Sequence, residues 1–328
     1  MANAYAVPDG ALDAPAESTG SGTLNRVLAE AFGTFVLVLG VLSVGVYSFL
    51  NQSGAVGVAL TAGLAYAAAL VAVGHVSGGW FNPVITLAQA IAGRVRWTEV
   101  PLYFAGQLVG GFAAGAVVRS TIPGDLPKLL SKADGQALFV DASNGWGDHS
   151  PLYTLSQGGA SFSWWQAGIV EVVATAALAG LALAASATRN RGIMAAAGGL
   201  GLAGLTVVTY AATGTGLNPV RSTVAALFAN NWSQTETAGA DGAPQLLDPV
   251  SPQLWLFWVA PLIGAAIAAL FAVAFGSATA EPVADATVDV DDDDDDDDEL
   301  VTDKPSDDAA EDDKTDADPA AATVKAAD

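Results

Sequence analysis

A short motif, Asn-Pro-Val, occurs twice in this chain and carries groups that could act on a solute. Its residues are Asn82, Pro83, Val84, Asn218, Pro219 and Val220, and Arg221 follows the second copy. An Asn-Pro pair favours the start of a helix, because Asn accepts hydrogen bonds at the N-cap and Pro needs no donor at the first helical position. The N-terminal end of a helix carries partial positive charge. Two such ends that meet would repel cations, which is the chemistry of a pore.

The elements that must position these motifs are membrane-spanning helices. The chain is 52% hydrophobic with a mean hydropathy of +0.42, and a spanning helix needs about 20 mostly apolar residues. The predicted spans are residues 27–49, 55–74, 100–118, 164–187, 193–212 and 255–275. The apolar stretches 83–92 and 219–229 are too short to cross, and each begins at an Asn-Pro pair. We predict an all-α membrane protein with six transmembrane helices and two re-entrant half-helices.

The two halves of the chain resemble each other. Glu30 in the first predicted span corresponds to Glu171 in the fourth, and each precedes its Asn-Pro pair by a similar distance. With three spans in each half, the halves cross the membrane in opposite directions, which predicts an inverted repeat with its site at the midplane. We assign repeat one to residues 24–119, an external loop to 120–163 and repeat two to 164–276. Residues 230–253 are predicted to form a second external loop.

Charge is concentrated at the C-terminal end of the chain. Residues 277–328 hold 21 of the 34 acidic residues and 3 of the 12 basic ones, with eight consecutive aspartates at 291–298. Like charges in a run repel each other, so we predict a disordered acidic cytoplasmic tail. Binding of Ca²⁺ or of a basic partner is the alternative to a solvated tail, and the abundance of Asp indicates a halophile. Residues 1–23 are predicted to be a disordered N-terminus, with no signal peptide.

The arginines favour one orientation in the membrane. With the N-terminus inside, the arginines on cytoplasmic flanks are Arg26, Arg94, Arg96, Arg189 and Arg191. Because basic residues concentrate in cytoplasmic loops, we expect a multi-pass protein of the cell membrane with both termini cytoplasmic. The chain has no Cys and two His, which argues against thiol chemistry and against a catalytic metal site. We predict no enzymatic activity, no cofactor and no nucleic-acid partner.

These motifs are similar to those of the major intrinsic protein family, the aquaporins and aquaglyceroporins. The segment 74–88, GHVSGGWFNPVITLA, resembles the first family signature, and 214–222, GTGLNPVRS, resembles the second. Glu30 and Glu171 match the family glutamates of spans one and four, and Gln107 matches its span-three glutamine. The resemblance covers the predicted channel domain, residues 24–276. It implies the aquaporin-like fold, a passive channel in the lipid bilayer, and a homotetramer in which each protomer has its own pore.

The resemblance also assigns roles to individual residues. Asn82 and Asn218 would each direct an amide N–H at the pore centre, and Arg221 would form the outer constriction and reject cations. Offsets from the Asn residues give the other constriction positions as Ala62, Thr206 and Thr215. The remaining residues would support the half-helices and their loops: Pro83, Val84, Pro219, Val220, Glu30, Glu171 and His75. The two glutamates would accept hydrogen bonds from loop backbone, and His75 would orient the first loop.

The filter residues bear on selectivity. Strict water channels of the family usually carry Phe and His where this chain has Ala62 and Thr206, so a wider filter is expected. Val84 and Val220 replace the usual alanines, and their extra methyl groups should press on the half-helix contact or its neighbours. Ser222 stands where glycerol channels usually carry Asp. This difference conflicts with the wider filter as an indication of glycerol transport.

We therefore expect a passive channel for water and small uncharged solutes, glycerol first, that excludes ions and protons. One alternative is a secondary transporter that uses Glu30 or Glu171 as its coupling group. Another is an adhesion or scaffold protein with a closed pore.

Overall fold

Six long helices form the body of the protein. A computed structural model describes residues 22–47, 54–188, 190–233, 235–238 and 244–275 of the chain. The long helices are α1 (Thr23–Val46), α3 (Gly54–Ser77), α5 (Val100–Thr121), α9 (Trp164–Ala187), α10 (Arg191–Thr213) and α12 (Leu256–Phe275). Each is long and apolar enough to cross a membrane, α12 together with the turn before it. The six predicted spans are confirmed.

Two short helices begin at the Asn-Pro pairs. They are α4 (Pro83–Ile91) and α11 (Pro219–Ala229). The Asn82 side chain accepts from the Val84 N–H at 3.0 Å, and the Asn218 side chain accepts from the Val220 N–H at 3.0 Å. At 1.5 Å per residue, helices of 9 and 11 residues reach only about half of a 30 Å hydrocarbon core. Both predicted half-helices are present.

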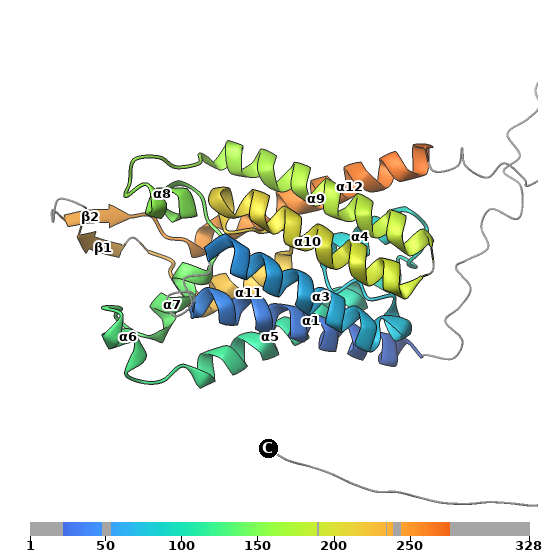
Figure 1. The fold of residues 1–328 in the computed structure, drawn as a ribbon, viewed down its shortest axis with the longest axis horizontal. Coiled ribbons are helices and arrows are strands. Elements are labelled where there is room, and N and C mark those ends of the chain that lie inside the picture. Colours follow the sequence, from blue (N-terminus) through green and yellow to red (C-terminus); the bar gives the residue numbers. More distant parts are fainter. Residues whose placement is uncertain (1–21, 48–53, 189, 234, 239–243, 276–328) are drawn as a thin grey trace, which may run out of the picture. The chain divides into compact units, whose positions relative to one another are not determined.

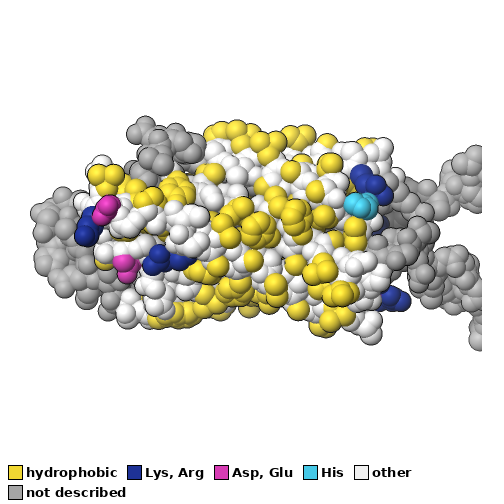
Figure 2. All heavy atoms as spheres, turned by 90° about the horizontal axis from the view of Figure 1, so that it is seen from below, with side chains coloured by type: hydrophobic (Ala, Val, Ile, Leu, Met, Phe, Trp, Pro, Cys, Tyr) yellow, Lys and Arg dark blue, Asp and Glu magenta, His cyan; other side chains and the backbone are white. Residues whose placement is uncertain are grey.

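The connections between spans gather at two ends of the bundle. We call the end with residues 122–163, 230–233 and 244–250 the long-loop end, and the end with residues 92–99, 188 and 190 the short-loop end. The start of α1 and the end of α12 both lie at the short-loop end, as an even number of crossings requires (Figure 1). On the face in Figure 2, the charged side chains lie near the two ends, and the surface between them is largely hydrophobic. That distribution suits a lipid-facing belt.

Glycines bring equivalent helices of the two halves into contact. A Cβ at Gly63 of α3 would lie 2.4 Å from the Gly199 carbonyl oxygen of α10, and one at Gly199 would lie 2.8 Å from the Gly63 oxygen. A Cβ at Gly110 of α5 would meet the α1 backbone, and one at Gly264 of α12 would meet the α9 backbone. The same close approach therefore recurs in both halves, as an inverted repeat requires.

Both external loops contain more regular structure than the sequence predicted. Within residues 120–163 lie α6 (Leu126–Leu129), α7 (Gly135–Ala142), the 3-10 turn η1 (Gly147–His149) and α8 (Pro151–Leu155). Within residues 230–253, β1 (Thr235–Ala238) pairs antiparallel with β2 (Pro244–Leu247), and the 3-10 turn η2 (Ser251–Trp255) follows. These elements are too short for a periodic hydrophobic pattern. The predicted disordered segments fall largely outside the described residues.

Candidate functional site

The two Asn-Pro-Val motifs meet where α4 and α11 begin. Asn82 Nδ2 donates to the Leu217 carbonyl at 2.9 Å, and Asn218 Nδ2 donates to the Phe81 carbonyl at 3.1 Å. Each Asn oxygen also caps its own half-helix, so both side chains are fixed at two points. Because an amide NH₂ has two hydrogens, each Asn keeps one further donor beyond this exchange. The positive ends of the two half-helices also meet here.

The residues before the two Asn are held in an unusual backbone conformation. Phe81 has φ 49° and Leu217 has φ 27°, a region that costs a non-glycine residue roughly 1–3 kcal/mol. Glu30 accepts from the Phe81 N–H at 2.7 Å, and Glu171 accepts from the Leu217 N–H at 2.8 Å. A buried carboxylate at the same place in each half therefore stabilises each strained loop.

Both glutamates are fully buried, and both oxygens of each accept hydrogen bonds. Glu30 also accepts from the Trp80 N–H, the Ser77 hydroxyl and the Gln107 amide. Glu171 also accepts from the Gly216 N–H and the Thr213 hydroxyl. This is the arrangement expected of a support for the loops.

The three residues predicted from offsets and Arg221 of the second motif come together around one cavity. Ala62 of α3, Thr206 of α10, Thr215 and Arg221 all line it, and Asn218 lies in the same wall. Much of the remaining wall is apolar: Leu37, Val41, Val58 and Leu202. The cavity thus joins the four predicted filter positions to Asn218.

The two filter threonines differ in their hydrogen bonds. Thr215 has φ 67°, and its hydroxyl donates to the Thr206 carbonyl at 3.1 Å and accepts from the Thr209 hydroxyl at 3.0 Å. The Thr206 hydroxyl is buried and has no hydrogen-bond partner among the described residues. A buried polar group left unpaired costs about 1–3 kcal/mol, so the Thr206 hydroxyl is left with an unmet hydrogen bond.

Arg221 is held by a residue that the sequence analysis missed. Its side chain is buried, Nη1 donates to Asn144 Oδ1, and Nη2 donates to the Gly214 carbonyl at 3.4 Å. Asn144 also accepts from the Ser222 hydroxyl at 2.8 Å and donates to the Thr213 carbonyl at 3.1 Å. The Arg221 Nε has no partner within the described part of the chain. Asn144 follows α7 in the external loop, and no spacing in the sequence relates it to the motifs.

The motif valines lie against neighbouring spans. Val84 is buried in a cluster with Ala179, Ala265 and Ala269, small residues of α9 and α12. Val220 lies over Gly111 of α5. A Cβ added at Gly111 would be 2.5 Å from Val220 Cγ1. The extra methyl groups were expected to press on the contact between the half-helices or on its neighbours. They pack against the neighbouring helices.

His75 lies apart from these residues. Its side chain is exposed at the end of α3, and no hydrogen bond to it is found among the described residues. The contacts seen on the first loop come instead from Glu30, Tyr66 and Tyr103.

Six spans and two half-helices that meet at paired Asn residues define a multi-pass membrane protein of the channel class. The chain belongs to the major intrinsic protein family, because the model of that family matches residues 17–272. It is 36% identical over 252 residues to Aquaporin Z of Photorhabdus laumondii, covering 74% of this chain and 93% of the relative. It is 36% identical over 251 residues to Aquaporin Z of Brucella melitensis, covering 75% and 96%.

A solved structure shares the fold. The aquaglyceroporin from Plasmodium falciparum superposes with a TM-score of 0.58 at 19% identity, covering 76% of this chain and 96% of that one. At that identity the likeness supports the architecture alone.

Proposed function

We propose that this protein is a passive channel for water and small neutral solutes such as glycerol. The observation that carries the proposal is the cavity in which Arg221, Thr206 and Asn218 share a wall. Two polar atoms of its wall residues, Arg221 Nε and the Thr206 hydroxyl, are buried without partners among the described residues. A hydroxyl-bearing solute or a water molecule supplies the missing bonds.

Selection against ions follows from charge. A permeant passes the Arg221 guanidinium and then the free amide hydrogens of Asn82 and Asn218, which donate to its oxygen. The positive ends of α4 and α11 repel cations at the same level, and donors on both sides of the permeant oppose a continuous proton wire.

Permeant size follows from the filter. Ala62 leaves space that an aromatic residue would fill, and Thr206 replaces a ring with a short hydroxyl side chain. The name of the relatives, Aquaporin Z, supports water as a permeant. We further propose a homotetramer in the cell membrane with both termini cytoplasmic.

Secondary transport is the less favoured function. Its coupling group would be Glu30 or Glu171, but both oxygens of each already accept hydrogen bonds from the loops. Protonating either carboxylate would remove an acceptor from the strained loop that it holds.

Stopped-flow light scattering of proteoliposomes tests the proposal with water, glycerol, urea and boric acid. We expect fast water and glycerol flux with a low activation energy, unaffected by ion or proton gradients, and protein-free liposomes give the background. Water flux without glycerol or urea flux would contradict the wide filter. Dependence on a proton gradient would favour the transporter.

A further inference from the structure

One face of α3 continues from the cavity toward the short-loop end. Val58 and Ala62 line the cavity. Residues four apart share a helix face, so the next positions on this face are Tyr66 and Leu70. Both are buried, 5% and 1% exposed, in the cluster that also contains Leu202 of the cavity wall. Tyr66 is therefore one turn from the cavity wall on the same face of α3, in the same buried cluster.

The Tyr66 ring reaches across to α10. A Cβ at Gly198 would lie 2.3 Å from the ring Cε1, so no larger residue fits there without moving the ring. Gly198 precedes Leu202 by one turn and Thr206 by two, and both of these residues line the cavity. Tyr66 thus contacts the continuation of the opposite wall.

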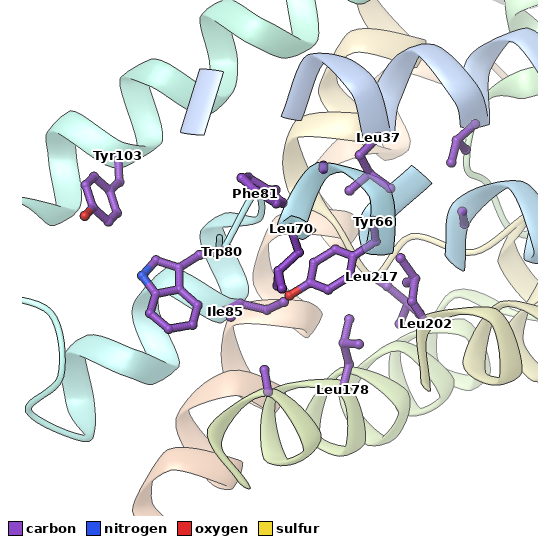
Figure 3. Close-up of a cluster of buried hydrophobic side chains, with 14 of the residues drawn as sticks. Leu37, Tyr66, Leu70, Trp80, Phe81, Ile85, Tyr103, Leu178, Leu202 and Leu217 are labelled. Carbon is purple, nitrogen blue, oxygen red and sulfur yellow. The ribbon is translucent and has the colours of Figure 1, made fainter. Parts of the chain in front are cut away.

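The same ring reaches the first re-entrant loop. It packs edge to face with Phe81 at a centroid distance of 5.9 Å, and its hydroxyl donates to the Gly79 carbonyl at 3.2 Å. Figure 3 shows Tyr66 within the cluster, with Leu70 on one side and Leu202 and Leu217 on the other. One side chain therefore joins α3, α10 and the loop that carries Asn82.

The side chains at positions 62 and 66 of α3 differ greatly in size. At residue 62 the side chain is a single methyl group, and one turn deeper on the same face it is an aromatic ring. While its hydroxyl is bonded to Gly79, that carbonyl has one lone pair fewer for a permeant. The ring also places apolar surface beside the path.

We propose that Tyr66 forms a second constriction and that it, rather than the four-residue filter, sets the upper size of the permeating solute. The inference rests on the proposed channel function. Where two constrictions lie in series, the narrower one limits the flux of a solute that barely passes. Because water is smaller, its permeability depends on Tyr66 less than the permeability of glycerol does.

The test is the ratio of glycerol to water permeability, measured by stopped-flow light scattering on proteoliposomes with equal amounts of reconstituted protein. We expect Tyr66→Val and the milder Tyr66→Leu to raise this ratio several-fold. Tyr66→Trp should lower it, because the larger ring narrows the path. Tyr66→Phe, which keeps the ring, should change it less than Tyr66→Leu does.

Tyr103 provides a matched control. It is a buried tyrosine whose hydroxyl donates to the carbonyl of Ser77, the last residue of α3, at 3.2 Å, but it lies on α5, which contributes no residue to the cavity wall. Tyr103→Phe therefore removes a comparable hydrogen bond and should leave the ratio unchanged.

The outcomes separate the inference from the proposed function. If wild type and all variants conduct no water, the channel proposal fails and the constriction fails with it. If water passes but the ratio in Tyr66→Leu equals that of wild type or of Tyr66→Phe, the inference alone is overturned. If Tyr66→Val does not reconstitute as a folded protein, Tyr66→Leu and Tyr66→Trp decide, because opposite changes in the ratio are required of them.

Discussion

At the residue scale, Arg221 enters the filter with part of its hydrogen bonding already satisfied. Asn144 and the Gly214 carbonyl occupy two of its nitrogens, while Nε has no partner among the described residues. A buried guanidinium fixed in this way holds its charge and its remaining N–H donors at a defined place. Charge and geometry can therefore be tested separately, by changing Arg221 itself and by changing the residue that holds it.

Replacing Arg221 with Val should raise cation leak. Two unit charges about 5 Å apart repel by about 3 kcal/mol at an effective dielectric constant near 20, so the increase should be roughly 100-fold. Electrical recording from planar bilayers measures the ion leak, and light scattering measures solute flux. Unchanged ion and solute permeability would argue against a filter role for Arg221.

Replacing Asn144 with Ala should also raise solute and ion leak, but less than the loss of Arg221 itself. The charge remains, while the guanidinium and the Ser222 hydroxyl lose their shared acceptor. Ser143→Ala is the neighbouring control, because the buried Ser143 hydroxyl bonds only to the Phe139 carbonyl of its own helix among the bonds found here. Equal leak in both variants would indicate a general loosening of the loop.

At the element scale, each half-helix is fitted to the span beside it. The contact between Val220 of α11 and Gly111 of α5 is tight, since the valine occupies the space that a Cβ at Gly111 would need. The usual family alanine would leave part of that space empty. The motif valine and the small residue opposite it therefore form a matched pair, and changing both should cost less than changing one.

Gly111→Ala should destabilise the protein by about 1–3 kcal/mol, the usual cost of overpacking a tight site. Adding Val220→Ala should restore most of that loss, because it removes the clashing methyl groups. The midpoint of thermal unfolding in detergent measures both effects. Gly180→Ala of α9 is the control, since nothing lies within 4 Å of its added Cβ. Additive losses in the double variant would contradict the pairing.

At the scale of the whole molecule, charge is divided unevenly along the chain. Residues 277–328 hold most of its acidic residues, 21 of 34. We propose that this charge serves hydration and solubility, as in a halophile, and that it takes no part in permeation.

Deleting residues 277–328 should leave water and glycerol permeability per protomer unchanged within measurement error. Light scattering on proteoliposomes at low and high salt checks this, because screening would reveal any electrostatic effect of the tail on the pore. Size-exclusion chromatography of the same truncation checks the proposed tetramer. Lost flux in a well-expressed, assembled truncation would give the tail a functional role.

Much of the architecture could be read from local pattern. Each span is a run of apolar residues near the required length, and each Asn-Pro pair starts a half-helix that is too short to cross. The helices α6 to α8 and the β1–β2 ribbon escaped prediction, because segments of four to eight residues carry no usable periodicity.

The sequence by itself determined the class of protein, since hydrophobic run length and the repeated Asn-Pro starts are local properties of the chain. Only the tertiary structure decided how Arg221 is held and which residues Tyr66 contacts. Asn144 comes to Arg221 across 77 residues, and Tyr66 meets Gly198 of another helix. Such contacts depend on how distant segments of the chain pack together. Neither composition nor the spacing of motifs predicts them.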